Sequence, residues 1–299
     1  MSTVPAANGG PTAVPGLPTR RVMLITHQAP EATQHGIPSI VSVIREAGVE
    51  LIVSPAEAAK HPILREFVSP NSPPFHAGGA DVILVAGGDG SILRALARQA
   101  GTGAPVVGIN YGRVGFLASI ERGDIERDLR RLFAGEYSIL GLPSLRVEWS
   151  DGAVEAVNDL AILRGGEARI ADLTYDIDGE RVATVRCDGL IASTPVGSTA
   201  YNLAAGGPTV SWRVRCYVVS FIAAHHLDTR PLVIAPEETL TITNAAVIGD
   251  CDILSDGKRV GSLAAGRSIS VGLGGSEVHL GIFPEASFFR RYREKFGRP

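Results

Sequence analysis

The first 140 residues alternate short apolar runs with segments of helical periodicity. Between the first two runs, Ile40, Val41 and Ile44 recur on one face of a helical pattern that covers residues 37–47. Continuous apolar strands separated by helices are typical of a parallel sheet that is buried on both faces. We therefore predict an α/β domain, with an irregular proline-rich stretch at residues 55–79. The runs that we interpret as strands are residues 22–26, 49–53, 81–86 and 105–109.

The pattern changes near Leu142, where short strand-like runs and tight turns replace the helical segments. Asp-Gly pairs flanked by β-forming residues are strong hairpin signals. Residues 142–283 are therefore predicted to form an antiparallel β domain. The last segment, residues 284–299, returns to a helical pattern, and we expect its aromatic side chains to pack back on the first domain. The Asp-Gly pairs are residues 151–152, 178–179 and 256–257.

Composition and charge narrow the setting of the protein. The 299 residues carry a net charge of −3, which provides no basic field for nucleic acid or an anionic membrane. Residues 1–19 are rich in small residues and proline, so we predict a disordered tail before an α/β domain at residues 20–141. The most apolar window, residues 217–224, is too short to span a bilayer. Three widely spaced cysteines and no metal-ligand spacing indicate a cytoplasmic protein without a disulfide framework.

One stretch combines a strand, a glycine turn and a helix. The apolar run from Val82 leads directly into Gly87-Gly88-Asp89-Gly90, and a helical pattern that Ser91 is expected to cap follows at once. This order aims backbone N–H groups and a helix N-terminus at one place, which suits a phosphate. A carboxylate in such a place is repulsive unless it handles a metal or a proton. The structural alternative is an ordinary turn in which Asp89 caps the helix.

Two absences restrict the class of phosphate site. No Gly-Lys-Ser/Thr ending follows the turn, so it is not the P-loop of a nucleoside triphosphatase. The GxGxxG spacing of a dinucleotide-binding turn is also absent, which argues against a dehydrogenase that transfers hydride.

Two further segments are rich in glycine and uncharged polar groups. Residues 110–117 follow a predicted strand, and Asn110 is expected to share one crevice with Gly87, since both lie at the carboxyl ends of parallel strands. Residues 188–208 contain mainly small and hydroxyl-bearing side chains, which would let a ligand approach the backbone closely. The alternative for this second segment is a tightly packed turn region whose Ser and Thr side chains satisfy the backbone.

Together the three segments resemble the NAD kinase family, whose members make NADP from NAD with ATP or polyphosphate. The matching signatures are the GGDG turn, Asn-x-Gly-x-x-Gly-Phe-Leu at residues 110–117, and Asp-Gly-x-x-x-Ser-Thr-Pro-x-Gly-Ser-Thr-Ala-Tyr with its Gly-Gly-Pro ending at residues 188–208. Asn158-Asp159, the Arg-Pro-Leu-Val element from Arg230 and the late Asp256-Gly257 also match. The resemblance implies an N-terminal α/β domain, a C-terminal β domain and a homodimer or homotetramer.

The resemblance also implies roles for individual residues. Asp89 would be the catalytic carboxylate that orients the 2′-hydroxyl of the adenosine ribose and accepts its proton. Magnesium and oriented N–H groups would neutralise the donor's charge, and the glycines would permit close approach and a positive φ. The donor-binding residues would be Gly87, Gly88, Gly90 and Ser91, and the NAD-binding residues would be Asn110, Asn158, Asp159, Asp188, Thr199, Ala200 and Tyr201.

Several positions depart from the family pattern. Ser91 replaces a usual Thr, and Val196 and Ala204 replace hydroxyl-bearing residues near the expected ligand. After Pro208 the chain diverges most, with Ala224 in place of a proline before His225. Two other interpretations therefore stay open: an inactive NAD(H)- or NADP-binding regulator on the same fold, and another kinase of the wider GGDG superfamily. The Arg213 and Arg215 side chains are expected on a solvated strand face, and His225 and His226 are expected to be structural or surface residues.

Overall fold

The computed structural model describes residues 13–68, 79–112, 115–166, 170–226 and 228–297. These residues form two compact units. The α/β unit contains the described residues up to 141 and from 278 onward, and the β unit contains residues 142–277. The sequence analysis places residues 278–282 in the β domain. The structure places them in the α/β unit, because Leu280 pairs in parallel with Val106.

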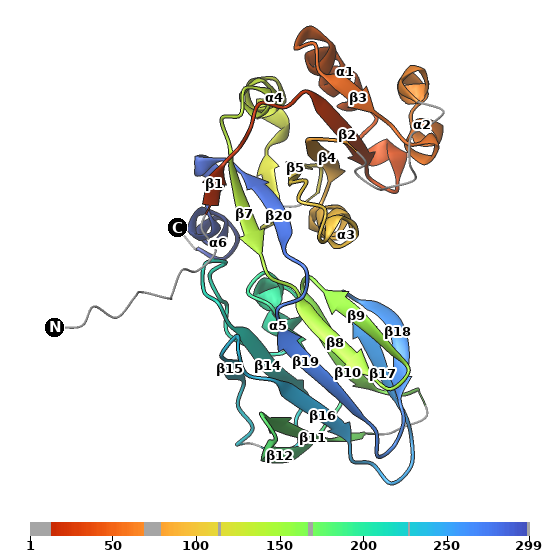
Figure 1. Ribbon diagram of the computed structural model, residues 1–299, viewed down its shortest axis with the longest axis vertical. Helices are drawn as coiled ribbons and strands as arrows, with labels where there is room; N and C mark the ends of the chain where they lie inside the picture. The colour runs from red at the N-terminus through yellow and green to blue at the C-terminus, as the bar shows by residue number, and fades with distance from the viewer. Residues whose placement is uncertain (1–12, 69–78, 113–114, 167–169, 227, 298–299) are drawn as a thin grey trace, which may run out of the picture. The chain divides into compact units, whose positions relative to one another are not determined.

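The sheet of the α/β unit has the strand order β1-β7-β20-β5-β4-β2-β3, with β6 beside β5 (Figure 1). Strands β2, β3, β4, β5 and β6 are parallel, as is the β20–β5 pair. The described strands are β1 (Ala13–Pro15), β2 (Arg21–Thr26), β3 (Glu50–Ile52), β4 (Val82–Gly87), β5 (Val106–Asn110), β6 (Ala118–Ile120), β7 (Ser138–Leu142) and β20 (Val278–Ile282).

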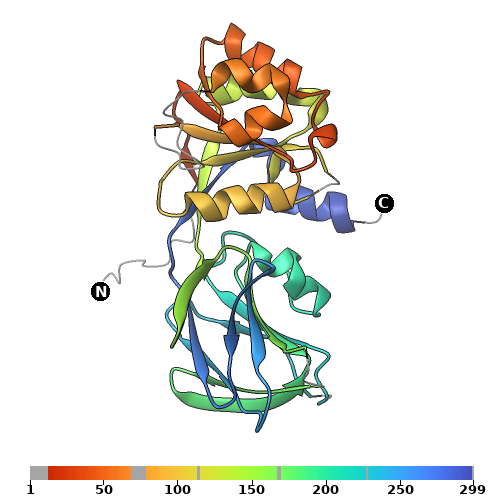
Figure 2. The same ribbon diagram turned by 90° about the vertical axis from the view of Figure 1, so that its right-hand side faces the viewer.

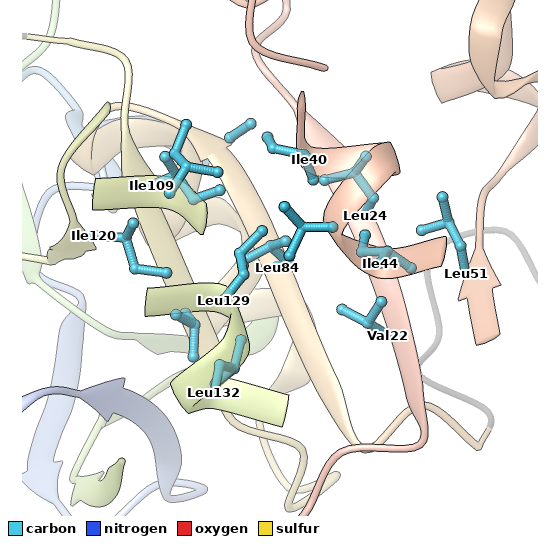
Figure 3. Close-up of a cluster of buried hydrophobic side chains, with 14 of the residues drawn as sticks. Val22, Leu24, Ile40, Ile44, Leu51, Leu84, Ile109, Ile120, Leu129 and Leu132 are labelled. Atoms are coloured by element: carbon cyan, nitrogen blue, oxygen red, sulfur yellow. The ribbon is translucent and has the colours of Figure 1, made fainter. Parts of the chain in front are cut away.

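Helices cover both faces of this sheet. Alternate residues of a strand point to opposite faces, and Leu24 and Leu84 face a buried cluster with Ile40 of α1 and Leu129 of α4 (Figure 3). The other face packs against α3, which lies along β4 and β5 (Figure 2). The α-helices are α1 (Ile37–Glu46), α2 (Pro55–Lys60), α3 (Asp89–Gln99), α4 (Ile125–Phe133) and α6 (Phe288–Phe296), and the 3₁₀ turns are η1 (Pro30–Ala32), η2 (Pro62–Phe67), η3 (Arg122–Asp124) and η5 (Pro284–Ala286).

The β unit consists of two six-stranded antiparallel sheets in the described residues. Their orders are β15-β14-β13-β10-β17-β18 and β12-β11-β16-β19-β8-β9. Apolar side chains from both sheets meet in one core, where the Tyr175 and Phe221 rings lie 5.4 Å apart. The elements are β8 (Leu145–Trp149), β9 (Gly152–Ala156), β10 (Asp159–Arg164), β11 (Ala171–Ile177), β12 (Glu180–Cys187), β13 (Gly189–Ser193), η4 (Gly197–Thr199), α5 (Tyr201–Ala204), β14 (Tyr217–Ile222), β15 (Leu232–Ile234), β16 (Leu240–Asn244), β17 (Cys251–Ser255), β18 (Lys258–Leu263) and β19 (Ser268–Leu273).

The predicted fold class is confirmed, and the three Asp-Gly pairs do join hairpin strands. Asp178 and Asp256 have positive φ angles of 49° and 48°, and each is followed by a glycine with positive φ. Asp-Gly suits such turns because glycine carries no Cβ and Asp tolerates the left-handed region.

Three local predictions were wrong. Residues 13–15 of the expected tail form β1, because they gain a backbone partner in β7; residues 1–12 lie outside the described residues. The stretch expected to be irregular contains α2, which begins because Ser54 caps it and Pro55 occupies its first position. The C-terminal helical segment is divided at Ser287, whose side chain caps α6.

Candidate active site

The glycine turn and the segment after β5 lie side by side at the carboxyl edge of the sheet. Gly87, the last residue of β4, pairs with Asn110, the last residue of β5. The backbone N–H of Tyr111 donates to the Gly87 carbonyl at 3.0 Å. This confirms the prediction that the two strand ends meet at one edge. Arg113 and Val114 of the second motif lie outside the described residues.

The Asp89 carboxylate is held by two backbone N–H groups from another part of the chain. Phe116 donates to Asp89 Oδ2 at 2.7 Å, and Leu117 donates to Asp89 Oδ1 at 3.1 Å. A Cβ on Gly115 would lie 2.2 Å from Asp89 Oδ1, so this approach requires glycine. The N-cap of α3 is Gly88, and no side-chain capping bond is made there. The carboxylate therefore does not serve as the helix cap, as the structural alternative for this turn expected; it ties the turn to residues 116–117.

The glycines of the turn do not have the expected backbone conformation. None of Gly87, Gly88 and Gly90 has a positive φ, since the chain passes from strand to helix through extended backbone at Gly88. Gly87 is instead restricted by Ser91, whose Cβ would lie 2.7 Å from an added Cβ. A Cβ on Gly90 would meet no heavy atom within 4 Å. Nothing in the described residues therefore crowds Gly90, and a ligand can approach the backbone there.

Ser91 does not cap α3, because the helix already begins at Asp89. Its buried hydroxyl accepts a hydrogen bond from Arg94 Nη2 at 3.1 Å. Both residues line a cavity of about 190 Å³, and Lys60 and Arg98 also lie in its wall. Three cationic side chains therefore share a cavity with Ser91, the residue that follows the glycine turn.

A buried carboxylate organises the wall of this cavity. Glu57 accepts hydrogen bonds from the backbone and the hydroxyl of Thr26 and from Lys60 Nζ at 2.8 Å. Glu57 is 1% exposed, and a buried charge is unfavourable unless it is paired. Lys60 and the Thr26 donors provide this compensation. Glu57, Lys60 and Arg94 were not predicted from the sequence as part of this cavity. The only sequence signal is their helical spacing, which is also typical of solvated helix faces.

Asn110 is buried, and its side chain is occupied within the protein. Its Oδ1 accepts from the Gly112 N–H at 3.1 Å, and its Nδ2 donates to Glu121 Oε2 at 3.1 Å. We expected Asn110 to face a ligand. In the described residues its side chain shapes the segment next to the turn, and both the oxygen and the NH2 group keep capacity for a further hydrogen bond.

In the β unit, Asn158 and Asp159 lie at the start of β10 and close on Asp256. The Asp256 carboxylate accepts backbone N–H bonds from Val157, Asn158 and Asp159 at 3.0, 2.7 and 3.3 Å. The side-chain Oδ1 of Asn158 is buried without a hydrogen-bond partner among the described residues. A buried acceptor without a donor is energetically unfavourable unless a ligand or water supplies one.

Burial and a neighbouring carboxylate change the acidity of Asp159. Desolvation, followed by the charge of Asp256, raises the pKa of Asp159 from 3.8 to about 7. Desolvation also raises the pKa of Asp256, although its three backbone N–H donors oppose this. The pKa values of both carboxyls are therefore raised, mainly by burial.

The polar segment 188–208 divides into a buried part and an exposed part. Ser193, Thr194, Ser198 and Asn202 are 0% exposed, and their side chains bond to neighbouring backbone groups. For these residues the packed-turn alternative is correct. By contrast, Ala200 is exposed, Thr199 is partly exposed, and Tyr201 is 39% exposed. Ala204, Gly206 and Pro208 are exposed as well, so the stretch from Thr199 to Pro208 presents the face of the segment that a ligand can meet without rearrangement.

Asp188 lies away from the other predicted NAD-binding residues of the β unit. In the β10–β13 register Asp159 pairs with Ser193, whereas Leu163 pairs with Gly189, next to Asp188. Five residues of strand separate the two positions by about 15 Å. Asp188 also forms an ion pair with Arg164 at 3.0 Å. The structure therefore does not bring Asp188 together with Asn158 and Asp159.

The departures after Pro208 lie mostly on the surface. His225 and His226 are exposed, as predicted for surface residues. Arg213 and Arg215 are also exposed, but they lie outside any strand, so the predicted strand face was wrong. Within the described residues, no three His, Cys, Asp or Glu side chains gather as a metal site, and no helix is long and apolar enough to cross a membrane.

Comparison with known proteins gives a consistent result. The family model described as the ATP-NAD kinase N-terminal domain matches residues 26–137, and the ATP-NAD kinase C-terminal domain matches residues 157–280. An NAD kinase of Symbiobacterium thermophilum is 33% identical, over 91% of this chain and 97% of its own length. NAD kinase 2 of Streptomyces coelicolor is 31% identical, over 94% and 95%.

Solved structures show the same fold. Yeast NADH kinase complexed with NADH superposes with a TM-score of 0.83 at 24% identity, over 94% of this chain and 88% of that one. An NAD kinase from Archaeoglobus fulgidus in complex with ATP has a TM-score of 0.72 at 26% identity, over 93% and 97%.

Proposed function

The chain belongs to the NAD kinase family, and from this premise we propose how its residues carry the reaction. An NAD kinase transfers a phosphoryl group to the 2′-hydroxyl of the adenosine ribose of NAD and so forms NADP. The observation that carries the proposal is the Asp89 carboxylate. It lies at the carboxyl edge of the sheet, is half-buried, and is oriented by the Phe116 and Leu117 N–H groups instead of capping its helix.

Asp89 orients the acceptor hydroxyl and takes its proton. A ribose hydroxyl is a poor nucleophile, and a positioned carboxylate improves it by accepting the proton as the oxygen attacks. The proton moves to a carboxylate oxygen, the new O–P bond forms at the 2′ position, and the shortened donor leaves with the electrons of the broken P–O bond. Each Asp89 oxygen accepts one backbone N–H and keeps further acceptor capacity for this step.

The donor lies on the other side of the turn. ATP supplies the phosphoryl group, and polyphosphate offers the same repeating phosphate chemistry. The uncrowded backbone at Gly90, the N-terminus of the 11-residue helix α3 and the cationic cavity with Lys60 and Arg94 supply N–H donors and positive charge for these phosphates. Gly87, Gly88 and Ser91 complete the proposed donor side.

Magnesium is part of the proposal. When bound, it would neutralise charge on the transferring phosphates. A Mg²⁺ ion is usually held by one or two carboxylates together with substrate phosphates instead of a protein cage. Asp89 is the half-buried carboxylate at the turn, so the described residues fit this mode of binding.

NAD is bound through the β unit. The unpartnered Asn158 Oδ1 is an acceptor for a ligand N–H or O–H group, and Asp159 lies next to it. Thr199, Ala200 and Tyr201 supply the accessible face of the 188–208 segment. Asn110 contributes by shaping its segment, as its occupied side chain requires.

Asp188 is not proposed to act with Asn158 within one chain. A homodimer or homotetramer, which we also propose, would be needed to bring it to a bound NAD. The proposed location is the cytoplasm, where three free, buried cysteines stay reduced.

The test is an assay of the purified protein with NAD, Mg²⁺ and either ATP or polyphosphate, read as NADP formed. We expect turnover with ATP. Arg94→Met should raise the KM for ATP several-fold and leave NAD binding unchanged. Arg130→Met, which removes exposed ion pairs of α4 with Glu126 on the same helix and Glu46 on α1, is the control and should change neither. Equal effects of the two substitutions on the KM for ATP would refute the proposed donor side.

A further inference from the structure

Helix α6, at the C-terminal end of the chain, contacts the residue that holds Asp89. The Phe116 ring lies 5.7 Å from the ring of Phe288 and 6.0 Å from that of Phe296, and Lys295 Nζ lies 5.0 Å from its centroid. The N–H of the same Phe116 donates to Asp89 at 2.7 Å. One residue therefore connects α6 to the proposed base.

A second route from α6 is ionic. Arg291 donates through Nη1 to Glu121 Oε1 at 2.6 Å and through Nη2 to the carbonyl of Ala118. The other Glu121 oxygen accepts from Asn110 Nδ2, and Asn110 Oδ1 accepts from the Gly112 N–H, both at 3.1 Å. This series of bonds runs from α6 to the segment beside the glycine turn.

The series ends against the turn itself. A Cβ added to Gly112 would lie 3.3 Å from Gly88 Cα, so the two backbones are nearly in contact. A displacement of Gly112 would therefore also displace Gly88, the residue before Asp89.

The burial of Arg291 indicates that this ion pair does more than fasten a helix. Arg291 is 5% exposed, whereas the neighbouring Phe289 is 71% exposed. The side chain of its partner Glu121 is 45% exposed, so the pair is buried on the arginine side only. Taking a guanidinium out of water is unfavourable and offsets part of what the pair contributes to stability. An Arg side chain that is held in one geometry does, however, define the position of its partner, because the N–H groups of the planar guanidinium point in fixed directions.

We propose that Arg291 is a positioning residue for phosphoryl transfer, acting through Glu121 and Asn110 to set the geometry of the segment that holds Asp89. The proposal rests on the role proposed for Asp89. Arg291 touches neither substrate nor the reacting atoms. Its removal leaves Asp89 in place but lets the carboxylate occupy unproductive orientations.

The chain offers a matched control on the same helix. Arg290 precedes Arg291, and its guanidinium pairs with Glu294 on the same helix at 2.8 Å. Both arginines line one cavity of about 420 Å³ in the α/β unit. Arg290→Met therefore removes a charge from the same helix and the same cavity and leaves the Arg291–Glu121 bond in place. Its partner Glu294 also lies 3.6 Å from Arg291 Nη1, so only this longer contact is shared.

The experiment compares the kcat of Arg291→Met and Arg290→Met, each per NAD-binding site measured by calorimetric titration. We expect Arg291→Met to lower kcat roughly tenfold or more, because a small misplacement of a catalytic group lowers the rate by at least that much. The KM for NAD should change less than about twofold, because the residues proposed to contact NAD directly lie on the β unit, whereas the Asn110 side chain is bonded within the α/β unit. Arg290→Met should leave both parameters unchanged. An equal kcat for the two variants overturns the proposal.

Two further variants separate positioning from folding. Glu121→Gln should lower kcat, and the double variant Arg291→Met with Glu121→Gln should be no worse than Arg291→Met alone, because both act on one route. Additive losses overturn the proposal. Arg291→Lys, which keeps the charge but loses the fork, should retain an intermediate kcat, and it replaces Arg291→Met if that variant does not fold. Full turnover of Asp89→Asn would instead refute the proposed function.

Discussion

The Asp89 carboxylate accepts the backbone N–H of Phe116 at 2.7 Å, although the two residues are 27 positions apart. This bond and its neighbour from Leu117 fix the carboxylate at the edge where β4 and β5 end. A phosphate loop alone would repel such a group. Its fixed geometry is explained if the carboxylate serves the acceptor hydroxyl while the turn serves the donor.

Gly115 is expected to be intolerant of a side chain. In Gly115→Ala the new Cβ would lie 2.2 Å from Asp89 Oδ1, so the carboxylate or the segment must move. We expect kcat to fall by about 100-fold, measured by steady-state NADP formation. Gly123→Ala is the control, because a Cβ there meets nothing within 4 Å. An unchanged kcat in Gly115→Ala would contradict the account of Asp89.

Asp256 is expected to be important for stability because of its backbone partners. Asp256→Ala leaves three N–H groups without an acceptor, and we expect a loss of about 3 kcal/mol in the free energy of unfolding. Asp178→Ala is a matched control, because Asp178 has nearly the same φ but accepts a single exposed N–H, from Thr239. Urea unfolding of both variants measures the difference, and equal losses would contradict the prediction.

The Asp159 pKa of about 7 makes stability depend on pH. Between pH 4 and pH 7 the folded state holds a proton that the unfolded state has lost, so this group makes stability fall as pH rises through that window. Asp159→Asn removes the effect. Between pH 4 and pH 8, the difference in free energy of unfolding between the variant and the parent should shift in favour of the variant. The shift is at most about 4 kcal/mol, at 1.36 kcal/mol per pKa unit. Urea unfolding at both pH values tests this, and a pH-independent difference would contradict it.

The two parts of the 188–208 segment should respond differently to substitution. Asn202→Ala removes bonds to the Ser198 and Pro208 carbonyls and to the Ser220 hydroxyl, so it should destabilise the fold by about 2–3 kcal/mol. Tyr201→Ala should weaken NAD binding and change stability by less than about 0.5 kcal/mol. Thermal unfolding measures the loss of stability, and calorimetric NAD titration measures the loss of binding. If Tyr201→Ala destabilised the fold and Asn202→Ala weakened NAD binding instead, the exposed face would not be the ligand face.

Local signals in the sequence were sufficient for much of the fold. Apolar runs located β2, β4 and β5, and Asp-Gly pairs located the hairpins, because these features depend on neighbouring residues. The pairing of β1 with β7 was not predictable in this way, since nothing in Ala13–Pro15 specifies a partner more than 120 residues away. The strand β20 was assigned to the wrong domain for the same reason.

The candidate site shows the same division between residues with a local sequence signal and residues without one. Asp89, Asn158 and Asp159 were predicted as site residues from motifs, but the groups that position them were not predicted. Asp256 was recognised as part of a turn, yet its carboxylate binds backbone groups about 98 residues earlier. Arg291 and Glu121 are 170 positions apart. Such pairs result from the fold and leave no local pattern.

The central claim is that Asp89 handles the proton of the acceptor hydroxyl. Asp89→Asn keeps the size of the side chain and one acceptor oxygen, but it removes the basic carboxylate and replaces the acceptor of one of the two backbone N–H groups by an NH2 group. The decisive measurement is the turnover of this variant with NAD, ATP and Mg²⁺, alongside its NAD dissociation constant by calorimetry. The account predicts a loss of at least about 100-fold in kcat with a dissociation constant within about twofold of the parent. Turnover close to that of the parent, or an equal loss of binding and turnover, would contradict it.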